Sequence, residues 1–170
     1  MGLAEGLSQA FDVLPDPLVV MLIAALPIVE VRGSIPVGIL VYEMSWPLAA
    51  LLSLVGNLAV APLLWAALSF VEKVGRRSRR IAYGLDWLYA RTRRKASRRG
   101  ESVKAGSVFA IVALPLPGAG TWTAVLTAYV LAMERRRALF AIVAGALVEV
   151  AVITAVVVSG AQAWQWLVSL

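Results

Sequence analysis

The chain has 170 residues, of which 61% are hydrophobic, and it carries a formal net charge of +6. A soluble domain is about 45–50% apolar, so the excess apolar surface has to face lipid and a soluble globular protein is excluded. The absence of Cys and His excludes disulfides, thiolate chemistry and the usual zinc sites, and we expect neither a metal nor a cofactor.

The basic residues are concentrated in two places. Twelve of the sixteen Lys and Arg residues lie between Lys73 and Lys104, three form Arg135–Arg137, and the remaining one is Arg32. Long apolar runs surround the basic stretch, which a nucleic-acid binder would not show. The charge therefore indicates membrane topology, and we expect no nucleic-acid partner.

Four apolar blocks follow one another, at residues 18–42, 46–71, 105–133 and 138–159. The second and fourth are uniformly apolar, and about 20 residues suffice to cross a bilayer core. The sequence therefore predicts transmembrane helices at 46–71 and 138–159.

The first and third blocks are interrupted near their middles. Proline removes a helix hydrogen bond, and glycine tolerates the backbone angles of a reversal. Each remaining arm has about a dozen residues, or about 18–20 Å of helix, so each block is either one kinked span or a hairpin that re-enters the same face. The interruptions are Pro27, Glu30, Arg32, Gly33 and Pro36 in the first block, and Pro115, Pro117, Gly118 and Gly120 in the third.

The positive charges favour the hairpin interpretation. The positive-inside rule places the loop 72–104 in the cytoplasm, and a re-entrant third block keeps Arg135–Arg137 there, whereas a crossing would move them outside. We therefore predict re-entrant hairpins at about 18–42 and 105–133, with fifteen of the sixteen basic residues inside. Both termini, including the tail 160–170, are then extracytoplasmic, in a bacterial or archaeal cytoplasmic membrane.

The predicted fold is an all-α integral membrane protein in two halves. Residues 1–71 and 105–159 each contain a hairpin followed by a span, in opposite orientations, which makes an inverted repeat of the kind that many transporters use. The basic segment 72–104 lies between the halves. Four of its apolar residues share one helical face, which predicts either an amphipathic helix on anionic lipid headgroups or a solvated loop: Ile81, Leu85, Leu88 and Tyr89.

The motif Glu-Val-Arg-Gly-Ser-Ile-Pro, which begins at Glu30, is the most informative stretch. Ionisable side chains within a membrane block usually mark a pathway or a pair, and at a non-helical tip Glu30 and Arg32 can converge on one cavity. We expect Gly33 in the turn, Pro36 in the first turn of the returning arm and Ser34 as its cap, so that this helix end and Arg32 bind an anion. The alternative is a pair that only stabilises the hairpin tip.

The second hairpin carries no charge between Leu114 and Trp122. Gly118 and Gly120 allow the backbone to approach a ligand closely. Thr121 is a candidate cap of the second arm, and Trp122 is a candidate wall of the cavity. The alternative is a tight turn packed against the first hairpin.

Two polar residues occupy equivalent positions in the predicted spans. Asn57 and Glu149 each lie eleven residues after the start of their block. Glu149 can carry a proton or pair with Arg32, whereas Asn57 is more often a helix–helix hydrogen-bonding group. No nucleophile or metal cluster accompanies the glutamates, so we do not expect an enzyme.

These stretches resemble a known family. The motif 30–36 and the stretch Pro-Leu-Pro-Gly-Ala-Gly-Thr-Trp at 115–122 are similar to the putative small multi-drug export proteins, as are the spacing and hydropathy of most of the chain. That family in turn resembles the DedA/VTT membrane proteins, which implies re-entrant hairpins and proton-coupled movement of lipid-linked phosphates such as undecaprenyl phosphate. By motif position, the resemblance implies roles for Glu30, Arg32 and Pro36, and for Pro117, Gly118 and Gly120 in a second hairpin that lacks the arginine of DedA proteins.

The sequence supports three hypotheses for function. In the first, a proton-coupled transporter or flippase moves an anionic lipid-linked phosphate that Arg32 holds, while Glu30 or Glu149 exchanges a proton. In the second, the same carboxylates serve a proton-coupled exporter of cationic amphiphiles. In the third, the protein is a membrane scaffold whose basic surface binds anionic lipids. Since two spans and two hairpins make a thin wall around a polar cavity, we expect a homodimer.

Overall fold

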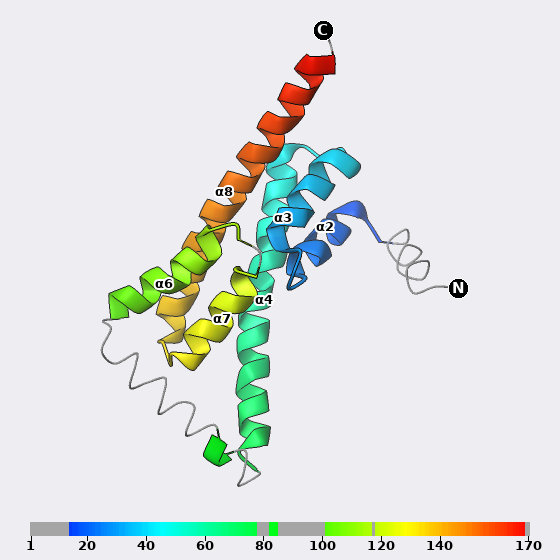
Figure 1. The fold of residues 1–170 in the computed structure, drawn as a ribbon. Helices are drawn as coiled ribbons and strands as arrows, with labels where there is room; N and C mark the ends of the chain where they lie inside the picture. The colour runs from blue at the N-terminus through cyan, green and yellow to red at the C-terminus, as the bar shows by residue number, and fades with distance from the viewer. Residues whose placement is uncertain (1–13, 78–81, 85–100, 117, 169–170) are drawn as a thin grey trace. The chain divides into compact units, whose positions relative to one another are not determined.

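The structure is a computed structural model, which describes residues 14–77, 82–84, 101–116 and 118–168. Every regular element in these residues is a helix (Figure 1), and two are long and apolar enough to cross a membrane, Trp46–Gly75 and Arg135–Ala161. The predicted all-helical class with two spanning helices is confirmed. The face formed by Ile81, Leu85, Leu88 and Tyr89 lies outside the described residues, as does Pro117.

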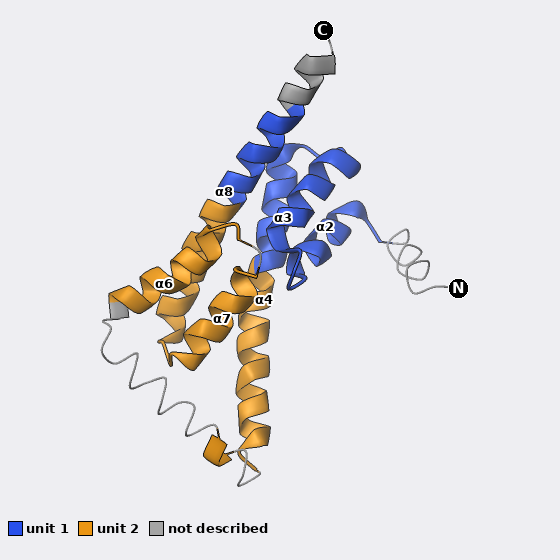
Figure 2. Ribbon diagram, in the orientation of Figure 1, with its two compact units in different colours: residues 1–57, 150–170 blue, residues 58–149 orange. Residues whose placement is uncertain are grey.

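Two compact units make up the chain (Figure 2). Unit 1 comprises residues 1–57 and 150–170, and unit 2 comprises residues 58–149. The two long helices, α4 (Trp46–Gly75) and α8 (Arg135–Val168), each contribute residues to both units.

Unit 1 begins with a short helical hairpin. Helix α2 (Asp16–Ala25) contacts α3 (Glu30–Pro36), which continues as the π-helix η1 (Val37–Val41). Helix α2 ends where it does because Pro27 restricts the preceding residue, Leu26, to an extended backbone with φ −73° and ψ 138°. The chain then turns and re-enters a helix at Glu30.

The predicted position of Pro36 is wrong. The returning arm begins six residues earlier, at Glu30, so Pro36 lies inside a helix and Ser34 does not cap one. The reversal is early because Pro27 and a left-handed Glu30, with φ 47°, already turn the chain. The proline ring cannot fit a regular α-helical turn, and the wider π-helical turn of η1 follows directly after it.

The apolar core of unit 1 joins α3 and η1 to parts of both long helices. Val31, Ile35 and Val150 are buried at its centre. Without a hydrophobic driving force in lipid, such contacts hold helices together by close packing. Half-buried apolar residues surround this centre: Ile39, Ala50, Leu54, Ile153 and Val157.

Unit 2 contains the second helical hairpin. Helices α6 (Glu101–Ala113) and α7 (Thr121–Val130) contact each other and are joined by residues 114–120. The reversal predicted at the glycines is observed, since Gly118 has φ 79° and Gly120 has φ 155° with ψ −167°. The second of these conformations is open almost only to glycine.

Each hairpin packs its first helix against a glycine of the long helix that follows it. In unit 2, a Cβ at Gly145 would lie 2.7 Å from the Cβ of Val112 and 2.8 Å from the carbonyl oxygen of Phe109. In unit 1, a Cβ at Gly56 would clash with the carbonyl oxygen of Met21. Both helices therefore approach their partner at backbone distance, as small residues allow in membranes.

Candidate substrate site

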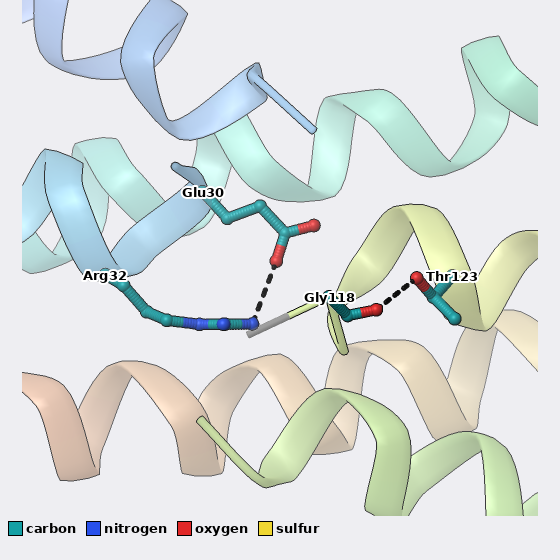
Figure 3. A network of polar contacts seen from close by, with 4 residues as sticks. All are labelled: Glu30, Arg32, Gly118 and Thr123. Carbon is teal, nitrogen blue, oxygen red and sulfur yellow. Dashed lines mark hydrogen bonds and ion pairs between the residues drawn. The ribbon is translucent and has the colours of Figure 1, made fainter. Parts of the chain in front are cut away.

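Glu30 and Arg32 meet at the start of α3. The Glu30 side chain is buried, and its Oε2 lies 3.5 Å from Nη2 of Arg32, whose side chain is 19% exposed (Figure 3). Two residues so close in sequence do not face each other on a regular helix. The left-handed φ of 47° at Glu30 removes that restriction, and the two side chains form an ion pair; their convergence on one cavity stays a prediction.

The conformation of Glu30 is itself costly. A left-handed backbone costs a residue other than glycine about 1–2 kcal/mol, and burial of a carboxylate adds a further cost unless it is paired. Such outliers persist where the surrounding structure enforces them and often lie at functional sites. The turn of the first hairpin is therefore the strongest candidate site in unit 1.

Other residues of the motif 30–36 take part in helix packing. Ser34 is fully buried, and its Oγ donates a hydrogen bond to Oγ of Ser53 on α4 at 2.7 Å. Gly33 accommodates the side chain of Val29, which a Cβ at that position would meet. Pro36 is half-buried within the helix. Sequence reasoning missed Ser53 because it is nineteen positions from Ser34, although a serine in an apolar span is a signal of a helix–helix hydrogen bond.

The second hairpin is built around its glycine turn. Gly120 occupies the N-cap position of α7 without a side-chain cap, and Thr121 is the first helical residue, so the predicted cap at Thr121 is wrong. The hydroxyl that bonds to the turn belongs to Thr123, whose Oγ1 donates to the carbonyl oxygen of Gly118 at 2.8 Å (Figure 3). Thr side chains commonly bond nearby backbone in this way, which is the signal that sequence reasoning missed.

Thr121 is fully buried in unit 2, and its hydroxyl has no hydrogen-bond partner among the described residues. Trp122, the predicted wall, is half-buried. A buried hydroxyl that finds no partner among the described residues is a group to which a polar ligand or water could bond. The start of α7 is therefore the candidate site of unit 2.

Both long helices carry buried polar residues. Asn57 in unit 1 and Glu149 in unit 2 are 0% exposed. Within the described part of the chain, neither amide atom of Asn57 has a hydrogen-bond partner, and the same is true of the hydroxyl of Thr154 in unit 1. Thr154 was not predicted, because a lone threonine in an apolar helix usually bonds its own backbone.

A further polar cluster in unit 2 joins α7 to α4. The Tyr129 hydroxyl donates to Oε2 of Glu72 at 2.5 Å, and Nε of Arg76 donates to Oε1 of the same carboxylate at 2.9 Å. The ring of Trp65 packs edge-on against Tyr129 with centroids 5.5 Å apart. No prediction included this cluster, since 57 positions separate Tyr129 from Glu72.

One comparison with known proteins gives a match. A family model described as putative small multi-drug export protein matches residues 30–152, well over half of the chain. The match begins at the buried Glu30 and includes the second hairpin and Glu149. Neither the curated proteins nor the solved structures give a match to the chain.

Proposed function

The chain belongs to the putative small multi-drug export protein family, and we propose that it is a proton-coupled transporter of an anionic, phosphate-bearing lipid across the cytoplasmic membrane. A membrane transporter rather than an enzyme agrees with the family description and with the two apolar helices of spanning length. The substrate class rests on Arg32, and undecaprenyl phosphate is the example that the DedA resemblance implies.

In this proposal each hairpin enters and leaves the membrane at a single face, the first at the extracytoplasmic face and the second at the cytoplasmic face. Helices α2 and α7 have 10 residues each and α6 has 13, which gives about 15–20 Å of helix against a hydrocarbon core of about 30 Å. Fifteen of the sixteen basic residues are then cytoplasmic, as the positive-inside rule requires, and both termini are extracytoplasmic.

An inverted repeat places the two hairpins in opposite halves. The glycines that receive the first helix of each hairpin, Gly56 and Gly145, support this proposal because the same packing device recurs in each unit. Inverted repeats with interrupted helices are a recurrent transporter plan. A homodimer is part of the proposal, since two spans alone make a thin wall around a polar path.

The observation that carries the proposal is the Glu30–Arg32 pair, with 3.5 Å between Oε2 and Nη2. A phosphate would compete with the Glu30 carboxylate for the guanidinium, because arginine recognises both groups with the same fork of N–H donors. Protonation of Glu30 removes the competitor and favours phosphate binding, and loss of that proton favours release. Proton movement and substrate movement are coupled through Arg32, with Glu149 as a second proton-carrying group.

Export of cationic amphiphiles is the second candidate. The uncharged turn between Leu114 and Trp122 and the family description favour it. Glu30 and Glu149 would then act as counter-ions of the cargo, and Arg32 would serve only to hold Glu30.

Transport by the purified protein in liposomes separates these candidates. With a fluorescent polyprenyl phosphate and a cationic dye as alternative cargoes, we expect Arg32→Lys to reduce phosphate-lipid transport by about tenfold or more, because the bidentate fork becomes a point charge. The matched control is Arg135→Lys, at an exposed arginine, which should transport normally. Undiminished phosphate-lipid transport by Arg32→Lys would refute the anion site, and transport of the dye alone would establish the second candidate.

Coupling is measured in the same liposomes with an imposed pH gradient. Glu149→Gln should abolish the response to the gradient, since an amide cannot bind and release the proton. A variant that still accumulates cargo in response to the gradient removes Glu149 from the mechanism.

A further inference from the structure

A pocket of about 410 Å³ lies between the first turns of α6 and of α8, in unit 2. Ser102 and Ala105 line it from α6, and Arg136, Arg137 and Phe140 line it from α8. None of these residues belongs to the candidate substrate site, and the transport proposal does not use them.

The surface of the pocket is mostly apolar, with a small polar part, and two of the five residues that line it are arginines. Two neighbouring guanidinium groups offer fixed forks of N–H donors that match phosphate oxygens, and Ser102 adds a hydroxyl. Glu134 forms an exposed ion pair with Arg137, at 3.1 Å between Oε2 and Nε. This carboxylate offsets the charge of Arg137, one of the two arginines in the lining, so Arg136, Arg137 and Glu134 together remain net positive. Phe140, 76% exposed, supplies an apolar surface beside the cations.

The position of the pocket along α8 indicates the depth at which it lies. The arginines occupy the first turn of α8, and the apolar stretch that makes α8 a candidate span begins directly after them. Basic residues at such a boundary lie among lipid headgroups on the cytoplasmic side. Phe140, one turn further along the helix, then lies at the level where acyl chains begin.

From this arrangement we propose that the pocket binds the phosphate of an anionic phospholipid of the cytoplasmic leaflet, with Arg136 and Arg137 on the headgroup and Phe140 against the upper acyl chain. A free phosphate would use the arginines but not the aromatic ring, so the exposed Phe140 favours the lipid. The bound lipid would hold the start of α6 to the start of α8. This site is distinct from the predicted lipid contact of the segment 72–104, because α8 supplies three of its five lining residues.

Lipid binding to the full chain in neutral detergent tests the proposal, with native mass spectrometry as the readout. Short-chain phosphatidylglycerol is titrated first, then phosphatidylcholine of the same chain length, and glycerol 3-phosphate serves as the acyl-free competitor. We expect Arg136→Gln/Arg137→Gln to weaken phosphatidylglycerol binding about tenfold or more. The control Arg135→Gln removes the charge of an exposed neighbouring arginine outside the pocket and should change binding less than about twofold, whereas Arg136→Gln and Arg137→Gln as single variants should each weaken it more.

Two further variants sharpen the outcome. Phe140→Ala should weaken phosphatidylglycerol by about threefold and leave glycerol 3-phosphate unchanged, since only the acyl chain loses a contact. Arg136→Lys/Arg137→Lys keeps the positive charges but removes the guanidinium groups. If the glutamine variant fails to fold, weaker phosphatidylglycerol binding by the lysine variant tests whether the paired N–H donors of arginine hold the phosphate. Equal losses in Arg135→Gln and in the single variants Arg136→Gln and Arg137→Gln would overturn the proposal, as would glycerol 3-phosphate that binds as tightly as the lipid. The pocket lies outside the candidate substrate site, so this result does not depend on the outcome of the transport experiments.

Discussion

Ser34 and Ser53 connect α3 to α4 through a hydrogen bond that has no access to solvent. Both side chains are 0% exposed, and the bond between their hydroxyl oxygens is 2.7 Å long. Each hydroxyl would otherwise lie in an apolar setting without a partner, where a buried polar group is costly. The first hairpin is therefore held to its long helix by this pair as well as by apolar packing.

Removal of one of these hydroxyls should lower the free energy of unfolding by more than the loss of the hydrogen bond alone, because the other hydroxyl is left buried without a partner. Ser34→Ala leaves the Ser53 hydroxyl buried and unbonded, so we expect a loss of about 0.5–2 kcal/mol in the free energy of unfolding. The double variant Ser34→Ala/Ser53→Ala should lose less than the sum of the single losses, because no orphaned group remains. Denaturant unfolding in detergent measures this, with Ser69→Ala as control, at an exposed serine whose hydroxyl donates to the carbonyl oxygen of Trp65 in its own helix. Additive losses would show that the two hydroxyls are not coupled.

At the same scale, sequence reasoning found the charged pair and missed the hydroxyl contacts. Glu30 and Arg32 are conspicuous because charges in an apolar block are rare, and the structure brings them together. Ser53 and Thr123 are ordinary residues in the sequence, and their role depends on which helix lies opposite or how a turn closes. An unusual residue can be recognised from the sequence around it, whereas the residue that it will contact cannot.

The glycines Gly56 and Gly145 set the distance between elements. At each, a Cβ would meet the backbone of the hairpin helix that lies against it. Gly56→Ala and Gly145→Ala should each lower the free energy of unfolding by about 1–3 kcal/mol, because overpacking forces a backbone shift. Thermal unfolding in detergent is the measurement.

Gly106 provides the matched control for this experiment. It lies in α6 with nothing within 4 Å of an added Cβ, so Gly106→Ala should be neutral or stabilising by about 0.4–1 kcal/mol. Equal stability of the Gly145→Ala variant and the wild type would mean that α6 does not rest on α8 at backbone distance.

The ends of elements were predicted with mixed success. Helix α4 begins at Trp46, as predicted, because the apolar stretch starts there after a polar loop. The predicted start of α3 is too late, because the prediction has Pro36 in the first turn of this helix and the helix begins at Glu30. The structure instead places Pro36 inside α3, directly before the π-helical turn η1, and the helix begins earlier because Pro27 and the left-handed Glu30 have already turned the chain.

The topology of the whole molecule can be tested directly, because the chain contains no native cysteine. Single cysteines at Asp16, Glu43, Ser102 and Glu134 occupy exposed positions that flank the two hairpins. With re-entrant hairpins, Asp16→Cys and Glu43→Cys should both react with an impermeant maleimide added outside whole cells. Ser102→Cys and Glu134→Cys should react only after the cells are opened, because basic flanks stay inside.

Arg77→Cys marks the cytoplasmic side in that experiment. A kinked span would place Asp16 and Glu43 on opposite faces, and likewise Ser102 and Glu134. Labelling of either pair from opposite sides would therefore exclude the re-entrant arrangement and the transport path built on it.

The sequence by itself determined the all-helical class of the protein, its two helices of spanning length and the site where the second hairpin reverses. These features follow from local quantities: an apolar stretch long enough for a bilayer, and proline and glycine at the turns. Only the tertiary structure decided that Ser34 bonds Ser53, that Tyr129 bonds Glu72, and that Arg136 and Arg137 share a pocket with α6. Each of these contacts joins segments far apart along the chain, and side-chain identity constrains a partner's chemistry but not its position.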